Sequence, residues 1–171
     1  GASMIIVLPA IMDLHSNGEA LTTVTKFKTE ATDVLDIVMK NMVGVYDTTK
    51  YGSIPFIYIG LVPLLFCILY FVSRKVPLKD KLLYGCLFGI LIASFYIVPL
   101  NLFWHGMHAP NMFLFRYAYL FSFLVIMLAG YGWEQLQQKD RGLFVIIGLS
   151  TIVVFALSYA LKGADSYDYV T

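Results

Sequence analysis

The sequence predicts an all-α protein: a fragment of a polytopic helical membrane protein with about four full transmembrane helices and one interfacial amphipathic helix. Three observations predict this class. Of 171 residues, 59% are hydrophobic and 13% are charged, whereas soluble domains average roughly 45–50% and about 25%. Long runs without any charge alternate with short charged connections. One polar region repeats its apolar residues at helical spacings of three and four.

Charge and cysteine content exclude several functional classes. The net charge is +1, and no Lys/Arg cluster has the size of a nucleic-acid surface, so we expect no nucleic-acid partner. Cys67 and Cys86 both lie inside apolar runs, where free cysteine behaves as a small hydrophobe. No Cys/His spacing resembles a metal site, so we expect no metal ligands among these residues.

The first part of the chain is expected to contain the end of one helix and then a polar segment. We interpret residues 1–12 as the end of a preceding transmembrane helix, so that the chain is a piece of a longer membrane protein. Residues 13–53 form an expected extracytoplasmic amphipathic helix and turn, with Asp36 and Lys40 on its polar face. That helix either packs on the protein or lies in the bilayer interface. Its apolar stripe consists of Leu21, Val24, Phe27, Ala31, Val34, Leu35, Val38 and Met42.

Four uncharged segments are each close to the about 20 residues that cross a bilayer as a helix. The predicted transmembrane helices cover residues 54–73, 82–100, 117–133 and 142–161.

Prolines and glycines divide these helices further. Pro55 suits a first helical turn, whereas Pro63 lies deeper and predicts a kink. Gly85 and Gly89 have the Gly-xxx-Gly spacing that lets another helix approach closely. Pro99 predicts that the second helix ends or unwinds just before residue 101.

The basic connection at residues 74–81 sets the expected topology. Short Lys/Arg-rich loops stay in the cytoplasm, and alternation then places residues 134–141 inside as well. Residues 13–53, 101–116 and the segment that begins at 162–171 are expected outside.

The segment 101–116 is the predicted substrate-site loop. It is apolar and aromatic, and such non-helical sequence beside membrane helices is expected only where it is buried in protein or lines a cavity. Arg116 opens the next helix, where a guanidinium is costly unless it is paired or reaches the interface. It suits a phosphate or carboxylate, which it can bind through two parallel hydrogen bonds. The alternative is an arginine that extends to the membrane surface.

Five other loop residues are candidates with an ordinary structural alternative each. His105 and His108 could donate hydrogen bonds to an anion or act as acid and base. The alternative is that each only forms a hydrogen bond with a neighbouring polar group. Asn101 and Asn111 could bind sugar hydroxyls or cap helices. Trp104 is either an interface anchor or a platform on which a sugar ring stacks.

Several motifs resemble the bacterial YfhO membrane proteins. Residues 55–64 read Pro-Phe-Ile-Tyr-Ile-Gly-Leu-Val-Pro-Leu, and residues 77–81 follow as a basic Pro-Leu-Lys-Asp-Lys loop. Residues 101–116 then match the pattern Asn-x-x-Trp-His-Gly-x-His-x-Pro-Asn-x-Phe-x-x-Arg. The chain departs from the pattern at Met112 and Leu114, where smaller or turn-forming residues are expected.

The resemblance implies a GT-C-like membrane glycosyltransferase. Such an enzyme transfers a sugar from a polyprenyl-phosphate donor to a cell-envelope polymer such as lipoteichoic acid, on the outer face. It implies membrane lipids, the lipid-linked donor, the polymer acceptor and the remainder of the polypeptide as partners. Independently of the resemblance, Asp47 and Lys50 precede the first full transmembrane helix on the same side as the loop and would line the rim of the site. The catalytic base would lie upstream of residue 1, so the fragment alone should be inactive.

The sequence leaves other functions and the cofactor open. A lipid-linked sugar transporter or flippase would use the same arginine and aromatic residues without breaking a bond, and broken helices would suit it. A non-catalytic scaffold of the envelope glycosylation machinery is the other alternative. No cofactor is specified; a divalent metal is the candidate, although no ligand set is visible.

Overall fold

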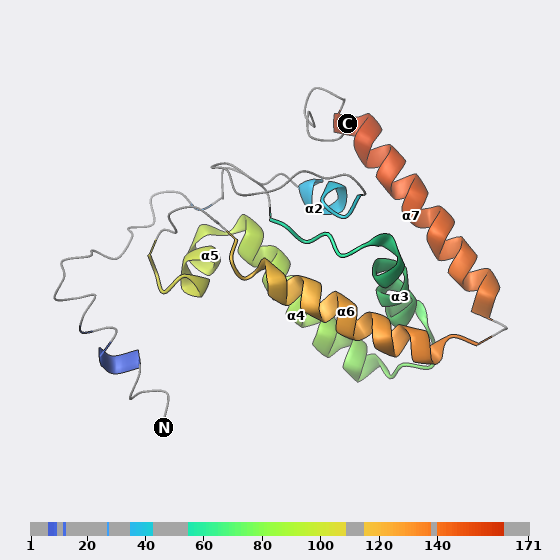
Figure 1. Ribbon diagram of the computed structural model, residues 1–171, viewed down its shortest axis with the longest axis horizontal. Helices are drawn as coiled ribbons and strands as arrows, with labels where there is room; N and C mark the ends of the chain where they lie inside the picture. Colours follow the sequence, from blue (N-terminus) through green and yellow to red (C-terminus); the bar gives the residue numbers. More distant parts are fainter. Residues whose placement is uncertain are drawn as a thin grey trace.

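A computed structural model describes residues 7–9, 12, 27, 35–42, 55–108, 115–137 and 140–162 (Figure 1). Within these ranges every regular element is a helix, which confirms the predicted all-α class. The helices are α2 (Asp36–Met39), α3 (Leu61–Val72), α4 (Leu78–Tyr96), α5 (Val98–Trp104), α6 (Ala118–Gln135) and α7 (Arg141–Lys162).

The core lies where α6 packs between α3 and α4. Phe95 of α4 and Val125 and Leu128 of α6 are almost completely buried there. A second cluster, which includes Phe66 of α3 and Ile147 of α7, fixes α7 to the other side of α3. Figure 1 shows α4 and α6 running alongside each other, with α3 next to α6 and α7 beyond α3.

A glycine of α6 allows the closest helix contact in the described part of the chain. A Cβ added at Gly132 would collide with the carbonyl group of Phe66, so only glycine fits there. The predicted small face of α4 has no such role among the described residues. Gly89 has no neighbour within 4 Å of an added Cβ, and the nearest atom to Gly85 is the end of a Phe71 side chain at 4.0 Å. The sequence gives the spacing of glycines but not the helix that lies opposite them.

The helix predicted at residues 54–73 is shorter than expected. Residues 55–60 have no regular secondary structure, and α3 begins at Leu61. Pro55 and Ile57 are completely buried, as apolar non-helical backbone beside membrane helices should be. Pro63 is therefore the third helical residue, where its missing N–H has no partner to lose, and the predicted kink is wrong.

The break predicted at Pro99 is confirmed. Ile97 is extended, with φ −106° and ψ 113°, and it separates α4 from α5. Pro99 then occupies the second position of α5, a place that suits its fixed φ. The expectation that the site loop is non-helical from residue 101 is wrong, because α5 continues through Trp104. The break restarts a helix instead of ending it.

The short helix α2 corrects part of the predicted amphipathic pattern. Asp36 and Lys40 belong to the predicted polar face, but their exposures are only 7% and 2%. The reason is that α2 packs against other helices: it contacts α7, and its residues line a pocket together with residues of α3 and α7. Most of the predicted helix over residues 13–53 lies outside the described residues.

One described helix meets the length and composition expected of a transmembrane helix. This is α7, over Arg141–Leu161. The apolar helix α3 has 12 residues and so rises only about 18 Å, against a hydrocarbon core of about 30 Å. Four full transmembrane helices are thus not shown by the structure. The bounds of α6 and α7 do lie within two residues of those predicted.

Lys75 joins the two basic connections at one end of the molecule. Its Nζ donates to the backbone oxygen of Gln135 at 2.7 Å and forms an ion pair with Oδ2 of Asp140, also at 2.7 Å. At the opposite end of α4 and α6, Ser94 contacts Tyr117. The connections before α4 and after α6 therefore lie at one end of these two helices, and α5 lies at their other end.

Candidate functional site

The candidate site is built where the end of α4, α5 and the turn before α6 meet. Nε1 of Trp104 donates to Oγ of Ser94 at 3.0 Å, and the hydroxyl of Tyr117 donates to the backbone oxygen of Ser94 at 2.6 Å. The rings of Trp104 and Tyr117 stack with centroids 5.3 Å apart and planes 20° apart. One serine thus fixes two aromatic rings from two elements.

Tyr117 continues this stack into the core. Its second ring neighbour is Phe95, with centroids 5.4 Å apart and planes inclined by 14°. His105 meets the Tyr117 ring at 67°, with centroids 5.8 Å apart. The imidazole therefore lies against a buried tyrosine that is already held from two sides.

A hydrogen bond to a backbone oxygen of α5 determines the tautomer of His105. Its Nδ1 lies 2.8 Å from the backbone oxygen of Asn101, and because a carbonyl can only accept, Nδ1 carries the proton. In the neutral ring Nε2 is then an acceptor. That atom is buried and has no hydrogen-bond partner among the described residues, and the same holds for Oδ1 of Asn101.

Gly106 ends α5 and turns the chain. The amide of Met107 donates to the oxygen of Leu102 at 2.7 Å, and that of Gly106 donates to the oxygen of Phe103 at 3.3 Å. These two bonds form a Schellman motif, with Gly106 in the required left-handed conformation at φ 67°. Met107 has φ 63°, which costs a residue with a Cβ about 1–2 kcal/mol. The turn brings exposed His108 to the outside of the cluster.

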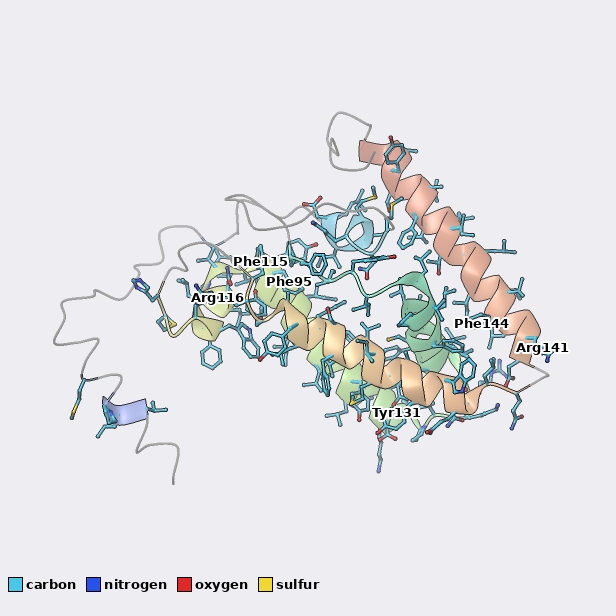
Figure 2. The ribbon with its side chains drawn as sticks, in the orientation of Figure 1. Phe95, Phe115, Arg116, Tyr131, Arg141 and Phe144 are labelled. Atoms are coloured by element: carbon cyan, nitrogen blue, oxygen red, sulfur yellow. The ribbon has the colours of Figure 1, made fainter. Side chains whose placement is uncertain are left out.

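Arg116 lies beside this cluster with its side chain exposed. It directly precedes Tyr117, and Figure 2 shows it next to α5 with Phe115 and Phe95 close by. Within the described ranges it forms no ion pair. The guanidinium is therefore available to an anion that approaches this end of the molecule.

The structure places the predicted site residues in three groups. Asn101, Trp104 and His105 come together on α5, while His108 and Arg116 flank them. Asn101 lies inside α5 and caps none of the described helices. Trp104 is 39% exposed but uses its N–H and one ring face within the protein. The remaining predictions, Asn111, Asp47 and Lys50, lie outside the described residues.

Sequence reasoning missed Ser94 and Tyr117, the two residues that hold the cluster together. Neither has an unusual type or spacing for an apolar helix. The available signal was the break at Pro99, because a broken helix releases carbonyl groups that need a partner from elsewhere. The amide of Val98 donates to Phe27 instead of to Ser94, four residues before it.

A comparison with protein families identifies the chain. The model of the bacterial membrane protein YfhO matches residues 1–171. The chain belongs to the YfhO family. No curated protein and no solved structure matches it. The resemblance in the motifs of residues 55–64 and 101–116 is thereby confirmed, and so is a membrane location.

The side-chain types of the cluster indicate which chemical group could bind there. The cluster combines an exposed guanidinium with stacked aromatic rings and two imidazoles. This set of side chains suits an anionic group that is attached to a ring or an apolar chain. Over the described ranges no three His, Cys, Asp or Glu side chains gather into a metal site. The chemistry that these residues support is hydrogen bonding and charge stabilisation.

Proposed function

We propose that this YfhO-family chain is part of a membrane glycosyltransferase that moves a sugar from a polyprenyl-phosphate donor to a cell-envelope glycopolymer such as lipoteichoic acid. A hydroxyl of the acceptor attacks the anomeric carbon, and the bond from that carbon to the phosphate oxygen breaks. The acceptor proton passes to a base, and the lipid phosphate leaves with an added negative charge. The chain's part in this reaction is to stabilise that charge.

The exposed side chain of Arg116 is the observation that carries the proposal. A guanidinium fixed near a developing phosphate charge stabilises the transition state more than the ground state. The stacked rings of Trp104 and Tyr117 hold the backbone beside Arg116, so its side chain extends from a fixed point next to the cluster. Its role is therefore electrostatic and does not require proton transfer.

The other site residues are proposed to shape the pocket. His108 is exposed and can donate to the phosphate or to a sugar hydroxyl. His105 is held by Asn101, and its Nε2 can accept a hydrogen bond once a substrate group reaches it. We assign Asn111 to the sugar pocket, and Asp47 and Lys50 to its rim because they precede the first predicted transmembrane helix on the same side of the membrane. The base itself is expected in another part of the protein.

The proposed orientation in the membrane has the site outside. Helices α4 and α6, with 19 and 18 residues, rise about 27–29 Å and cross most of a bilayer core. α3 would cross together with the extended residues 55–60, and α7 would be the fourth crossing. The basic connections joined by Lys75 then lie in the cytoplasm and the α5 end faces the envelope.

Substitution of Arg116 in the native gene tests the proposal. We expect Arg116→Gln to lower the sugar content of the envelope polymer about 100-fold, which is typical of losing one transition-state donor. Arg116→Lys should retain part of the activity, because it keeps the charge but loses the paired hydrogen bonds. Arg141→Gln is the matched control, since Arg141 is exposed at the opposite end (Figure 2). Normal decoration in Arg116→Gln cells with normal protein levels would leave only a scaffold role.

The break between α4 and α5 favours a lipid-linked sugar flippase as the second candidate. Discontinuous helices are common at the binding sites of transporters, and the extended Ile97 lies next to the aromatic cluster. Membrane vesicles supplied with labelled polyprenyl-phosphate sugar separate the two functions. A transferase produces labelled polymer, whereas a flippase only changes the side on which the labelled donor is found.

A further inference from the structure

A groove between α2, α3 and α7 is separate from the candidate site. Its volume is about 510 Å³, and ten of its thirteen lining residues are apolar. None of them belongs to α4, α5 or α6. Along α7 the lining extends from Leu143 to Phe155, which corresponds to a rise of about 18 Å. That length is close to one leaflet, half of a hydrocarbon core of about 30 Å.

Asn41, one of the residues that line this groove, has a buried side-chain oxygen without a hydrogen-bond partner in the described part of the chain. Nδ2 of Asn41 donates to the backbone oxygen of Ile37 at 2.8 Å. A carbonyl can only accept, so the nitrogen must face it and the orientation of the amide is determined. Oδ1 of Asn41 is then an acceptor, and it is buried without a hydrogen-bond partner in the described part of the chain. Asn41 is 7% exposed and lines the groove.

These features specify the chemistry of a ligand. The apolar walls require hydrocarbon, and the free amide oxygen requires one hydrogen-bond donor, because an unsatisfied buried acceptor is unfavourable. No lysine or arginine lines the groove, so nothing there compensates a phosphate charge. A polyprenyl phosphate therefore fits poorly: its chain has no donor and its head group is anionic.

We propose that the groove binds a neutral glycerolipid with a free hydroxyl group, a lipid of the diacylglycerol type. Its acyl chain lies along α3 and α7, and its hydroxyl donates to Oδ1 of Asn41. This site does not involve Arg116 and does not depend on sugar transfer. It anchors a membrane lipid against the chain at a distance from the aromatic cluster.

Photocrosslinking in proteoliposomes tests this site. The protein is placed in phosphatidylcholine, which has no hydrogen-bond donor, with a trace of diacylglycerol that carries a photoactivatable group on its acyl chain. Crosslinks mapped by mass spectrometry are expected in α3 and α7. Unlabelled dioleoylglycerol should compete about tenfold better than its acetate ester, which lacks the hydroxyl.

Paired variants locate the binding. Val154→Trp places a large ring in the groove and should lower crosslinking about tenfold, whereas Val153→Trp, at an exposed position next to the groove-lining one, should not. Asn41→Leu should keep crosslinking but remove the preference for the free hydroxyl. Arg116→Gln should change neither result, which separates this proposal from the glycosyltransferase.

Four results would overturn the proposal. Equal competition by dioleoylglycerol and its acetate would remove the role of Asn41. Stronger competition by a polyprenyl phosphate would assign the groove to the sugar donor. Equal losses in Val153→Trp and Val154→Trp, or crosslinks that no competitor displaces, would mean that the lipid contacts the outside of α7 or that another protein segment occupies the groove.

Discussion

Tyr117 holds the start of α6 against the end of α4. Its hydroxyl binds the backbone oxygen of Ser94, and its ring contacts Phe95, Trp104 and His105. Because Arg116 is the preceding residue, the position of the guanidinium depends on this tyrosine more than on any contact of its own. A single side chain therefore connects the folded core to the candidate phosphate-binding residue.

Removing the Tyr117 hydroxyl tests this dependence. Tyr117→Phe leaves the Ser94 oxygen buried and without its donor, so we expect a loss of about 1–3 kcal/mol in the free energy of unfolding. Tyr119→Phe is the control, since Tyr119 is exposed and lies two residues further on. Thermal unfolding in a mild detergent compares the two. Equal midpoints would show that Ser94 finds another donor.

At the end of α5, the left-handed Gly106 determines where the helix stops. Gly106→Ala meets no neighbouring atom, so its cost arises only from the backbone at φ 67°, about 1–2 kcal/mol. Met107→Gly should have the opposite effect, because it relieves the strain at φ 63°. Unfolding midpoints that move in the same direction for both variants would contradict the assigned motif.

The contact between α3 and α6 depends on the absence of a side chain at Gly132. Gly132→Ala would force a Cβ against the backbone of Phe66, which cannot rotate away. We expect it to destabilise the protein by about 1–3 kcal/mol, as overpacking does. Gly130→Ala on the same helix meets nothing within 4 Å and should be neutral or up to about 1 kcal/mol stabilising. Chemical denaturation of the purified protein measures both.

The sequence predicts where helices begin and end better than it predicts which helices pack against one another. The bounds of α6 and α7 follow from runs without charge, and the α4–α5 break follows from Pro99, because both signals are local. The place of Pro63 in the first turn of α3 and the role of Gly132 depend on which segments pack together. The same holds for the site: the residue types of Arg116 and Trp104 are visible in the sequence, but the Ser94–Tyr117 hydrogen bond is not.

For the molecule as a whole, the positions of Lys75 and Tyr117 at opposite ends of α4 and α6 make the orientation testable. Phe103 and Lys79 are exposed near the two ends, and Cys86, the exposed native thiol, is first replaced by alanine. In intact cells a membrane-impermeant thiol reagent should modify Phe103→Cys. Lys79→Cys should react only after the cells are opened, because the basic connection lies in the cytoplasm.

Lys79→Cys at the start of α4 and Phe103→Cys in α5 must give opposite results in that experiment if α4 crosses the bilayer. Modification of both cysteines in intact cells would place α4 on one side, and its length of 19 residues would then have no relation to membrane thickness. The reversed pattern would put Arg116 in the cytoplasm, away from the polymer that it is proposed to help glycosylate. Since the labelling depends only on sidedness, it decides the orientation even where a substitution abolishes activity.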